Sequence, residues 1–79
     1  MGYALRTFKG RVVRFWRDKS YGYVRCPGGR EAHFHLRDFE QRTGADEINK
    51  GTALEFYLSD DPKGLSAIRI RKLEHEPQT

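Results

Sequence analysis

Short segments in which apolar and polar side chains alternate run along most of the chain, separated by Gly, Pro, Asn and Asp residues. In residues 32–36, for example, alanine, phenylalanine and leucine alternate with His33 and His35. Alternation with a period of two is typical of strands that bury one face, because successive side chains point to opposite sides. The pattern predicts five strands, at residues 7–17, 21–26, 32–36, 52–59 and 65–73.

The segments between these strands carry the residues that favour turns and loops. Turns are predicted at residues 18–20, 27–29 and 60–64, where Asp, Ser, Pro and Gly gather. Residues 37–51 are polar, with room for one short helical turn around residues 37–39 but for no long helix. The strands predict an all-β fold, a five-stranded antiparallel OB-type barrel, because closure removes the unpaired edges of an open sheet.

The inward-facing positions of these strands predict the core. It consists of Val12, Val24, Phe34, Leu54, Phe56, Leu58, Ile68 and Ile70. Such a core is thin, so we expect a stability of about a few kcal/mol. Cys26 is the single cysteine, which excludes an internal disulfide, and its place in the strand predicts a buried thiol with no catalytic role. A chain without a disulfide fits the reducing environment of the cytoplasm.

The length of 79 residues predicts one domain, with a core over about residues 7–73 and a frayed tail at residues 74–79. The longest apolar run has three residues, against the roughly 20 that a membrane span needs, so no membrane partner is expected. No apolar stretch near the start has the features of a signal peptide. We expect a cytoplasmic monomer, with a dimer left open.

Charge is distributed unevenly along the sequence. The whole chain carries a net charge of +4, but residues 1–30 carry eight Lys or Arg and one acid, for a net +7. Residues 31–61 carry a net −5, and residues 62–79 a net +2. A basic half that is also rich in aromatic residues indicates a polyanion with rings that stack, which means nucleic acid. The charge by itself is equally compatible with an ordinary solvated surface.

If Val24 and Phe34 point into the barrel, the residues that alternate with them point outward, on two strands that pair through the predicted turn. The outward rings are Tyr21, Tyr23, His33 and His35. Lys19 and Arg25 flank these rings. Burial favours aromatic residues, so an exposed cluster of them calls for an explanation. Stacking of unpaired bases, worth about 1–3 kcal/mol per base, supplies one, and the nearby cations attract phosphates.

Residues 10–24 resemble the opening of the cold-shock domain, G-x-V-K-W-F-N-x-x-K-G-F-G-F-I. The family's first RNA-binding motif, K-G-F-G-F-I, corresponds to residues 19–24, and its second, V-F-V-H-F, to residues 32–36. Residues 64–70 are similar to the family's G-P-x-A-x-N-V, so the resemblance covers about residues 9–73. It implies a five-stranded OB-type barrel that binds single-stranded RNA or DNA on strands two and three. It also implies an RNA chaperone, or a regulator of transcription or translation, that uses no ATP.

The resemblance implies roles for the residues that match the two motifs. Tyr21 and Tyr23 match the stacking rings of the first motif, and Lys19 matches its phosphate-binding lysine. In the second motif, His33 takes the position of a stacking phenylalanine, and His35 takes that of the family's histidine.

Positions around the motifs both match and depart from the family. Phe15 matches the family's phenylalanine, and Lys63 lies where a basic residue often precedes G-P. Arg14 stands at the position of the family's exposed tryptophan, whereas Trp16 stands at that of an asparagine. Whether Trp16 or Phe15 replaces the exposed tryptophan is open at this point.

Two further departures are Ser20, in place of a glycine that allows a tight turn, and Leu36, in place of an aromatic ring. With Ser20 we expect an altered local backbone. With fewer large rings we expect weaker binding or a different base preference, partly offset by arginines that also stack. The candidate nucleic-acid-binding residues are Arg14, Phe15, Trp16, Lys19, Tyr21, Tyr23, Arg25, His33, His35 and Lys63.

Other activities have less support in the sequence. His33 and His35 have the spacing of two metal ligands on one strand, but no third ligand is evident, so no metal site is predicted. The chain has no Walker-type loop and no activated nucleophile. The sequence therefore predicts no enzymatic activity, no cofactor and no small-molecule substrate. Two alternatives stay open: a protein-binding adaptor with weakened nucleic-acid binding, and a small histidine-dependent ribonuclease. Stacking does not distinguish RNA from DNA.

Overall fold

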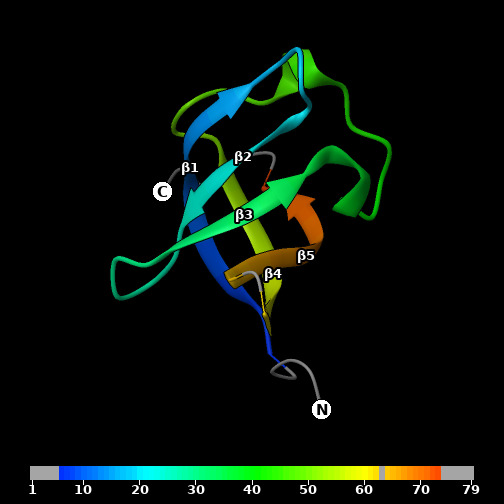
Figure 1. Ribbon diagram of the computed structural model, residues 1–79. Helices are drawn as coiled ribbons and strands as arrows, with labels where there is room; N and C mark the ends of the chain where they lie inside the picture. Colours follow the sequence, from blue (N-terminus) through cyan, green and yellow to red (C-terminus); the bar gives the residue numbers. More distant parts are fainter. Residues whose placement is uncertain (1–5, 63, 74–79) are drawn as a thin grey trace, which may run out of the picture.

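The computed structural model describes residues 6–62 and 64–73 of the chain. The strands within these residues are β1 (Phe8–Trp16), β2 (Tyr21–Arg25), β3 (Glu31–His35), β4 (Ala53–Asp61) and β5 (Gly64–Lys72) (Figure 1). Their connection between β3 and β4 contains two short 3₁₀ helices, η1 (Leu36–Asp38) and η2 (Ala45–Glu47). The predicted strands are confirmed, with ends that lie within two residues of the predicted ones. The predicted helical turn is η1, whereas η2 was not predicted.

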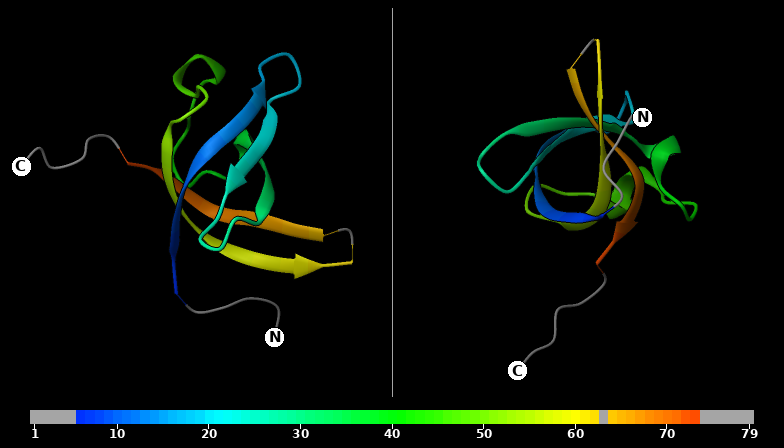
Figure 2. Two further views of the ribbon diagram at one scale, coloured as in Figure 1. Left: turned by 90° about the vertical axis from the view of Figure 1, so that its left-hand side faces the viewer. Right: turned by 90° about the horizontal axis from the view of Figure 1, so that it is seen from below.

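The strands close into a barrel in the order β1-β2-β3-β5-β4 (Figures 1 and 2). Neighbouring strands are antiparallel except β3 and β5, which run parallel and meet at His33 and Ser66. The prediction of an all-β, five-stranded OB-type barrel is confirmed, but the prediction of purely antiparallel pairing is wrong. An odd number of strands cannot alternate in direction all the way round a closed ring, so one neighbouring pair has to be parallel.

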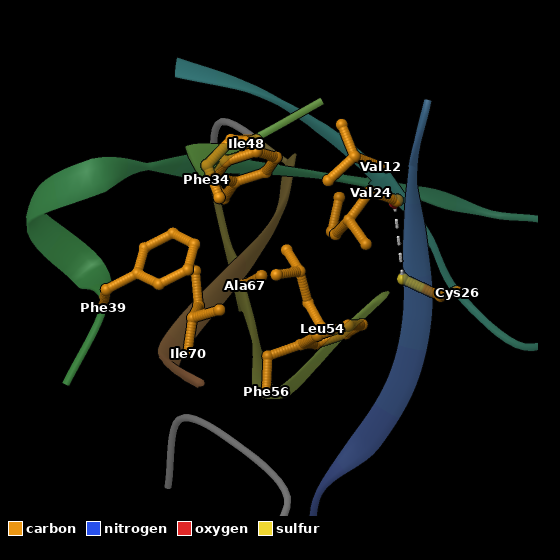
Figure 3. Close-up of a cluster of buried hydrophobic side chains, with 11 residues drawn as sticks. Val12, Val24, Cys26, Phe34, Phe39, Ile48, Leu54, Phe56, Ala67 and Ile70 are labelled. Atoms are coloured by element: carbon orange, nitrogen blue, oxygen red, sulfur yellow. Dashed lines mark hydrogen bonds between the residues drawn. The ribbon is translucent and has the colours of Figure 1, made fainter. Parts of the chain in front are cut away.

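The core fills the inside of the barrel (Figure 3). Its buried side chains are Val12, Val24, Cys26, Ala32, Phe34, Phe39, Ile48, Leu54, Phe56, Ala67 and Ile70. Six of the eight predicted core residues are among them, and Leu58 is half-buried against the cluster. Burial raises the pKa of the Cys26 thiol, against a smaller opposing effect of Arg30, so the thiol is protonated at neutral pH.

The prediction that Ile68 belongs to the core is wrong, because β5 contains an irregularity. Ala67 and Ile70 are the buried residues of this part of the strand, three positions apart. Arg69 between them has a φ of 51°, and the register between β4 and β5 shifts here. An extra residue in a strand moves the side chains that follow it to the other face. Ile68 therefore lies opposite Tyr57 and is half-buried.

The connection between β3 and β4 supplies two core residues that its polar composition concealed. Phe39 forms an isolated bridge with Ile70, and its ring meets that of Phe34 edge-on, with 6.0 Å between the centroids. Ile48, which follows η2 directly, is fully buried. The connection therefore packs against the barrel interior instead of looping freely through solvent.

The predicted frayed tail at residues 74–79 lies outside the described residues. All the described strands belong to the one barrel, while a single domain over the whole chain stays a prediction. Within residues 6–62 and 64–73, no helix combines the length and the apolar character that crossing a bilayer requires.

Candidate nucleic-acid interface

A bulge in β1 decides which of its side chains face outward. Val12 is buried, so strict alternation along the strand would turn Arg14 and Trp16 inward as well. The register between β1 and β2 shifts at Val13, and Arg14 thereby lies opposite Tyr23. Bulges commonly re-aim side chains in this way. Arg14 and Trp16 are consequently exposed, on the same face of the sheet as Tyr23.

Four rings gather on the outer face of β1, β2 and β3. This group is called the aromatic platform, and it consists of Trp16, Tyr21, Tyr23 and His33. The Trp16 ring lies 5.3 Å from Tyr21 and 6.1 Å from Tyr23, measured between centroids. The His33 ring lies 5.2 Å from Tyr21 and 5.6 Å from Tyr23. Each ring therefore contacts two others, in the tilted and edge-to-face arrangements that aromatic pairs favour.

The platform is accessible to solvent. Trp16 is 38% exposed, more than any other large hydrophobic side chain in the described part of the chain. Tyr21, Tyr23 and His33 are half-buried by their contacts with one another and with Trp16. The expectation that Tyr21, Tyr23 and His33 share one outward face is confirmed, and Trp16, whose position the sequence left open, lies on the same face.

Gly22 allows β1 and β2 to approach closely beneath the platform. A Cβ atom at this position would overlap the carbonyl oxygen of Arg14 and would crowd the Phe15 ring. Because Gly22 lies between two platform tyrosines and opposite β1, a side chain there would push the strands apart. The glycine therefore keeps Trp16 within contact distance of the tyrosines.

Phe15, in contrast, is not part of the platform. Its ring stacks on Phe34 of the core, with 5.9 Å between the centroids and an angle of 3° between the planes. Phe15 packs against the core cluster and is half-buried. Of the two candidates for the exposed aromatic position, Trp16 is thus the one at the surface.

Arg14 is held over the platform by an acidic residue that the sequence reasoning did not single out. The guanidinium carbon of Arg14 lies 5.5 Å from the centroid of the Tyr23 ring. Arg14 Nη2 lies 3.2 Å from Glu31 Oε1, and Arg25 Nη2 lies 3.4 Å from Glu31 Oε2. Side chains two positions apart in a strand share a face, so Glu31, two residues before His33, could have been placed on this face from the sequence.

His35 has a structural contact that separates it from His33. Its Nδ1 accepts a hydrogen bond of 3.0 Å from the backbone N–H of Arg37, which caps η1. No ring contact joins His35 to the platform within the described residues. Nor do those residues contain a group of three or more His, Cys, Asp or Glu side chains arranged to hold a metal ion.

The turn from β1 to β2 presents cations beside the platform. The backbone N–H groups of Lys19 and Ser20 both donate to the carbonyl of Trp16, at 3.1 and 2.8 Å. Ser20 has a φ of 63°, a conformation that glycine adopts more easily than serine. Arg17 and Lys19 are exposed on this turn, and neither has an ion pair among the described residues. Lys63, also a candidate, lies outside the described residues.

Four of the eight acidic residues in 31–61 form ion pairs within the part of the chain that the structure describes. The pairs are Glu31 with Arg14 and Arg25, Glu40 with Arg69, Glu47 with Lys72, and Glu55 with Arg71. Hydrogen bonds lower two of the carboxyl pKa values: that of Glu47, chiefly through the backbone N–H of Gly44, and that of Glu55, chiefly through Arg71. Half of the acidic residues of this segment are therefore compensated by a neighbouring cation among the described residues.

Comparison with known proteins places this geometry in context. The family described as 'Cold-shock' DNA-binding domain matches residues 8–73. The chain belongs to the cold-shock domain family. A Cold shock-like protein of Aquifex aeolicus is 34% identical over 68 residues, which are 85% of this chain and 96% of that protein. The cold-shock domain family binds nucleic acids and is not a family of enzymes, and its barrel here carries an exposed aromatic face.

Proposed function

We propose that the protein binds single-stranded RNA or DNA by stacking unpaired bases on the aromatic platform. The observation that carries this proposal is the gathering of Trp16, Tyr21, Tyr23 and His33 on one exposed face. Stacking on aromatic side chains is worth about 1–3 kcal/mol per base and tolerates every base, because every base has a π-face. Bases in a duplex are already stacked and paired, so the platform favours single strands.

The proposed mechanism needs no motor and no cofactor. The cations Lys19 and Arg25 border the platform and attract the phosphates of the strand. A protein that holds exposed bases shifts the equilibrium of a structured RNA toward its open form. The cellular role that follows is that of an RNA chaperone, or of a regulator of transcription or translation of the cold-shock type. A monomeric domain in the cytoplasm suffices for this role.

The experiment that tests the proposal uses Trp16, the only tryptophan of the chain. Its fluorescence is followed while short single-stranded RNA, single-stranded DNA and duplex of the same sequence are added at several salt concentrations. Saturable quenching by the single strands, weakened by salt, is the expected result. Anisotropy of a labelled oligonucleotide runs in parallel. Equal affinity for duplex, or no binding at low salt in either measurement, would contradict the proposal.

The adaptor hypothesis predicts a different outcome. It rests on the departures in the second motif and on the net −5 of residues 31–61, where four of the eight acidic residues form ion pairs within the described barrel. If the barrel is mainly an adaptor, replacing Tyr21 and Tyr23 by alanine abolishes oligonucleotide binding without loss of the biological activity. The ribonuclease hypothesis predicts cleavage of labelled RNA that is lost in His33→Ala or in His35→Ala.

A further inference from the structure

An open recess of about 550 Å³ lies beside the aromatic platform, between the end of β1 and the segment that precedes β4. It combines an apolar floor with a cationic rim. The floor is formed by Val13 and Phe15, which are half-buried, together with the buried Ile48, and the rim by Arg14, Arg17 and Lys50; Asn49 also lines the recess. Its volume falls within the range of about 300–1,000 Å³ that is typical of sites for small organic groups.

The recess exists because β4 does not accompany β1 along its whole length. The two strands pair only from Phe8 to Arg11 of β1. Val12 makes the last backbone contacts: its N–H donates to Thr52 at 2.9 Å, and its carbonyl accepts from Gly51 at 2.8 Å. Beyond this point β1 bulges, and the segment around η2 lies beside its free edge, at the same end of the barrel (Figures 1 and 2).

The chemistry of the recess fits a nucleotide better than it fits a bare anion or an apolar group. Arg17 and Lys50 are exposed, and within the described residues neither one has an ion pair. Two available cations attract a phosphate. The apolar side chains of Val13 and Phe15, which also line the recess, suit a base or a sugar.

The recess is continuous with the platform through Arg14. This side chain lines the recess, and its guanidinium group also lies over the Tyr23 ring. Trp16 of the platform stands between Phe15 of the floor and Arg17 of the rim in the sequence. A strand that stacks on the platform therefore reaches the recess by crossing β1.

We propose that the recess is a second contact site for the same single strand, and that it holds a nucleotide next to those on the aromatic platform. The phosphate of this nucleotide lies between Arg17 and Lys50, and its base rests on the floor formed with Phe15. The proposal rests on the proposed function and deepens it, since it predicts the path on which a longer strand leaves the platform.

The test compares the double variant Arg17→Gln/Lys50→Gln with wild type on two oligonucleotides, of about four and about ten nucleotides. The slope of log Kobs against log salt concentration is measured for both. Each lost phosphate contact makes the slope for a single strand shallower by about 0.7, and one phosphate lies between the two cations, so we expect a change of about 0.7 for the long strand. The short strand occupies the platform alone, and its slope stays as in wild type.

The matched control is Lys9→Gln/Arg42→Gln, which also removes one lysine and one arginine, both exposed and away from the lining of the recess. It should leave both slopes unchanged. An equal change of the salt slope for both strand lengths, or the same change in the control variant, would mean that the cations act only through the net charge. Either result would overturn the proposal. A wild type that binds neither strand contradicts the proposed function itself, whereas variants that bind the long strand like wild type contradict the recess alone.

The role of the apolar floor is tested separately, with long oligonucleotides that carry an abasic nucleotide at one end or the other. Loss of the base at the end that reaches the recess should weaken binding, while loss at the opposite end should not. Arg17→Gln/Lys50→Gln should abolish this difference between the ends. Equal affinity of both abasic strands for wild type would overturn the placement of a base in the recess.

Discussion

The outer surfaces of β1–β3 and of β4–β5 contain similar residue types but use them differently. On β1, β2 and β3 the rings of Trp16, Tyr21 and Tyr23 contact one another and remain open to solvent. On β4 and β5, Tyr57 contacts Arg69, whose guanidinium carbon lies 5.9 Å from the centroid of the tyrosine ring. The first surface groups several stacking rings, whereas the second presents one ring already covered by a cation.

The two surfaces also differ in the acidic partners of their cations. The cations of β5 each have an acidic partner: Arg69 with Glu40, Arg71 with Glu55, and Lys72 with Glu47. Beside the platform, Arg17 and Lys19 lack such a partner among the described residues. Exposed ion pairs contribute little to stability, with about 0–1 kcal/mol as the median, but they neutralise the field that attracts a polyanion. Because Arg14 and Arg25 are also paired, with Glu31, the difference between the two surfaces lies in the turn from β1 to β2, where Arg17 and Lys19 are exposed.

Removal of the platform rings should have the largest effect on the difference between the two surfaces. Tyr21→Ala/Tyr23→Ala should weaken oligonucleotide binding by about 2–6 kcal/mol, or at least about 30-fold in Kd, because two stacking surfaces are lost. Tyr57→Ala is the matched control on the other surface, and it should change Kd less than about twofold. Anisotropy titration measures both, with circular dichroism to verify folding. Equal losses in the two variants would contradict the assignment of the binding surface.

The platform also depends on the close approach of β1 and β2. Gly22→Ala should destabilise the fold by about 3 kcal/mol, because its Cβ overlaps backbone atoms of β1 that cannot move aside easily. Gly44→Ala is the control: Gly44 has a φ of −85°, and a Cβ there crowds only the flexible carboxylate of Asp46. Urea unfolding measures both variants. A Gly22→Ala protein as stable as wild type would show that the strands separate at no cost.

A substitution in the turn that leads from β1 to β2 should have a smaller effect, and it should stabilise the protein. Ser20 holds a φ of 63°, so Ser20→Gly should stabilise the protein by about 1 kcal/mol through relief of the left-handed conformation. Ser59→Gly, in the extended strand β4, should instead destabilise it by about 0.5–1 kcal/mol. Thermal unfolding of the two variants tests this contrast, and a destabilised Ser20→Gly protein would refute it.

The smallest effect concerns the paired charges of β4 and β5. Hydrogen bonds from Arg71 and Thr7 lower the pKa of Glu55 from its usual 4.5. A lowered pKa in the folded state stabilises the protein above pH 4.5, and this contribution disappears as the pH falls through the folded-state pKa. Glu55→Gln should therefore cost less than about 1 kcal/mol at neutral pH, and the difference from wild type should vanish in acid.

Urea unfolding at several pH values measures this difference. Oligonucleotide affinity of Glu55→Gln should equal that of wild type, because the ion pair lies on the surface away from the platform. A marked change in affinity with no change in stability would show that the β4–β5 charges take part in binding.

Local patterns were sufficient to predict part of the fold and of the site. Alternation in residues 21–26 and 32–36 predicted the strands and placed Tyr21, Tyr23 and His33 on one face, as the structure confirms. Alternation failed where a strand is irregular: it placed Ile68 in the core, and it did not decide between Phe15 and Trp16. The polar composition of residues 37–51 likewise concealed the core residues Phe39 and Ile48, together with the helix η2.

The strand pattern, the barrel class, the basic aromatic half of the chain and the two motifs of the cold-shock domain family can all be read from the sequence alone. Those properties are local, since each strand carries its own period of two and each turn its own residues. Only the tertiary structure decided the exposure of Trp16, the position of Arg14 over Tyr23, and the recess between β1 and Lys50. These depend on a bulge and on barrel closure, and both arise from the pairing of segments that are distant in the sequence.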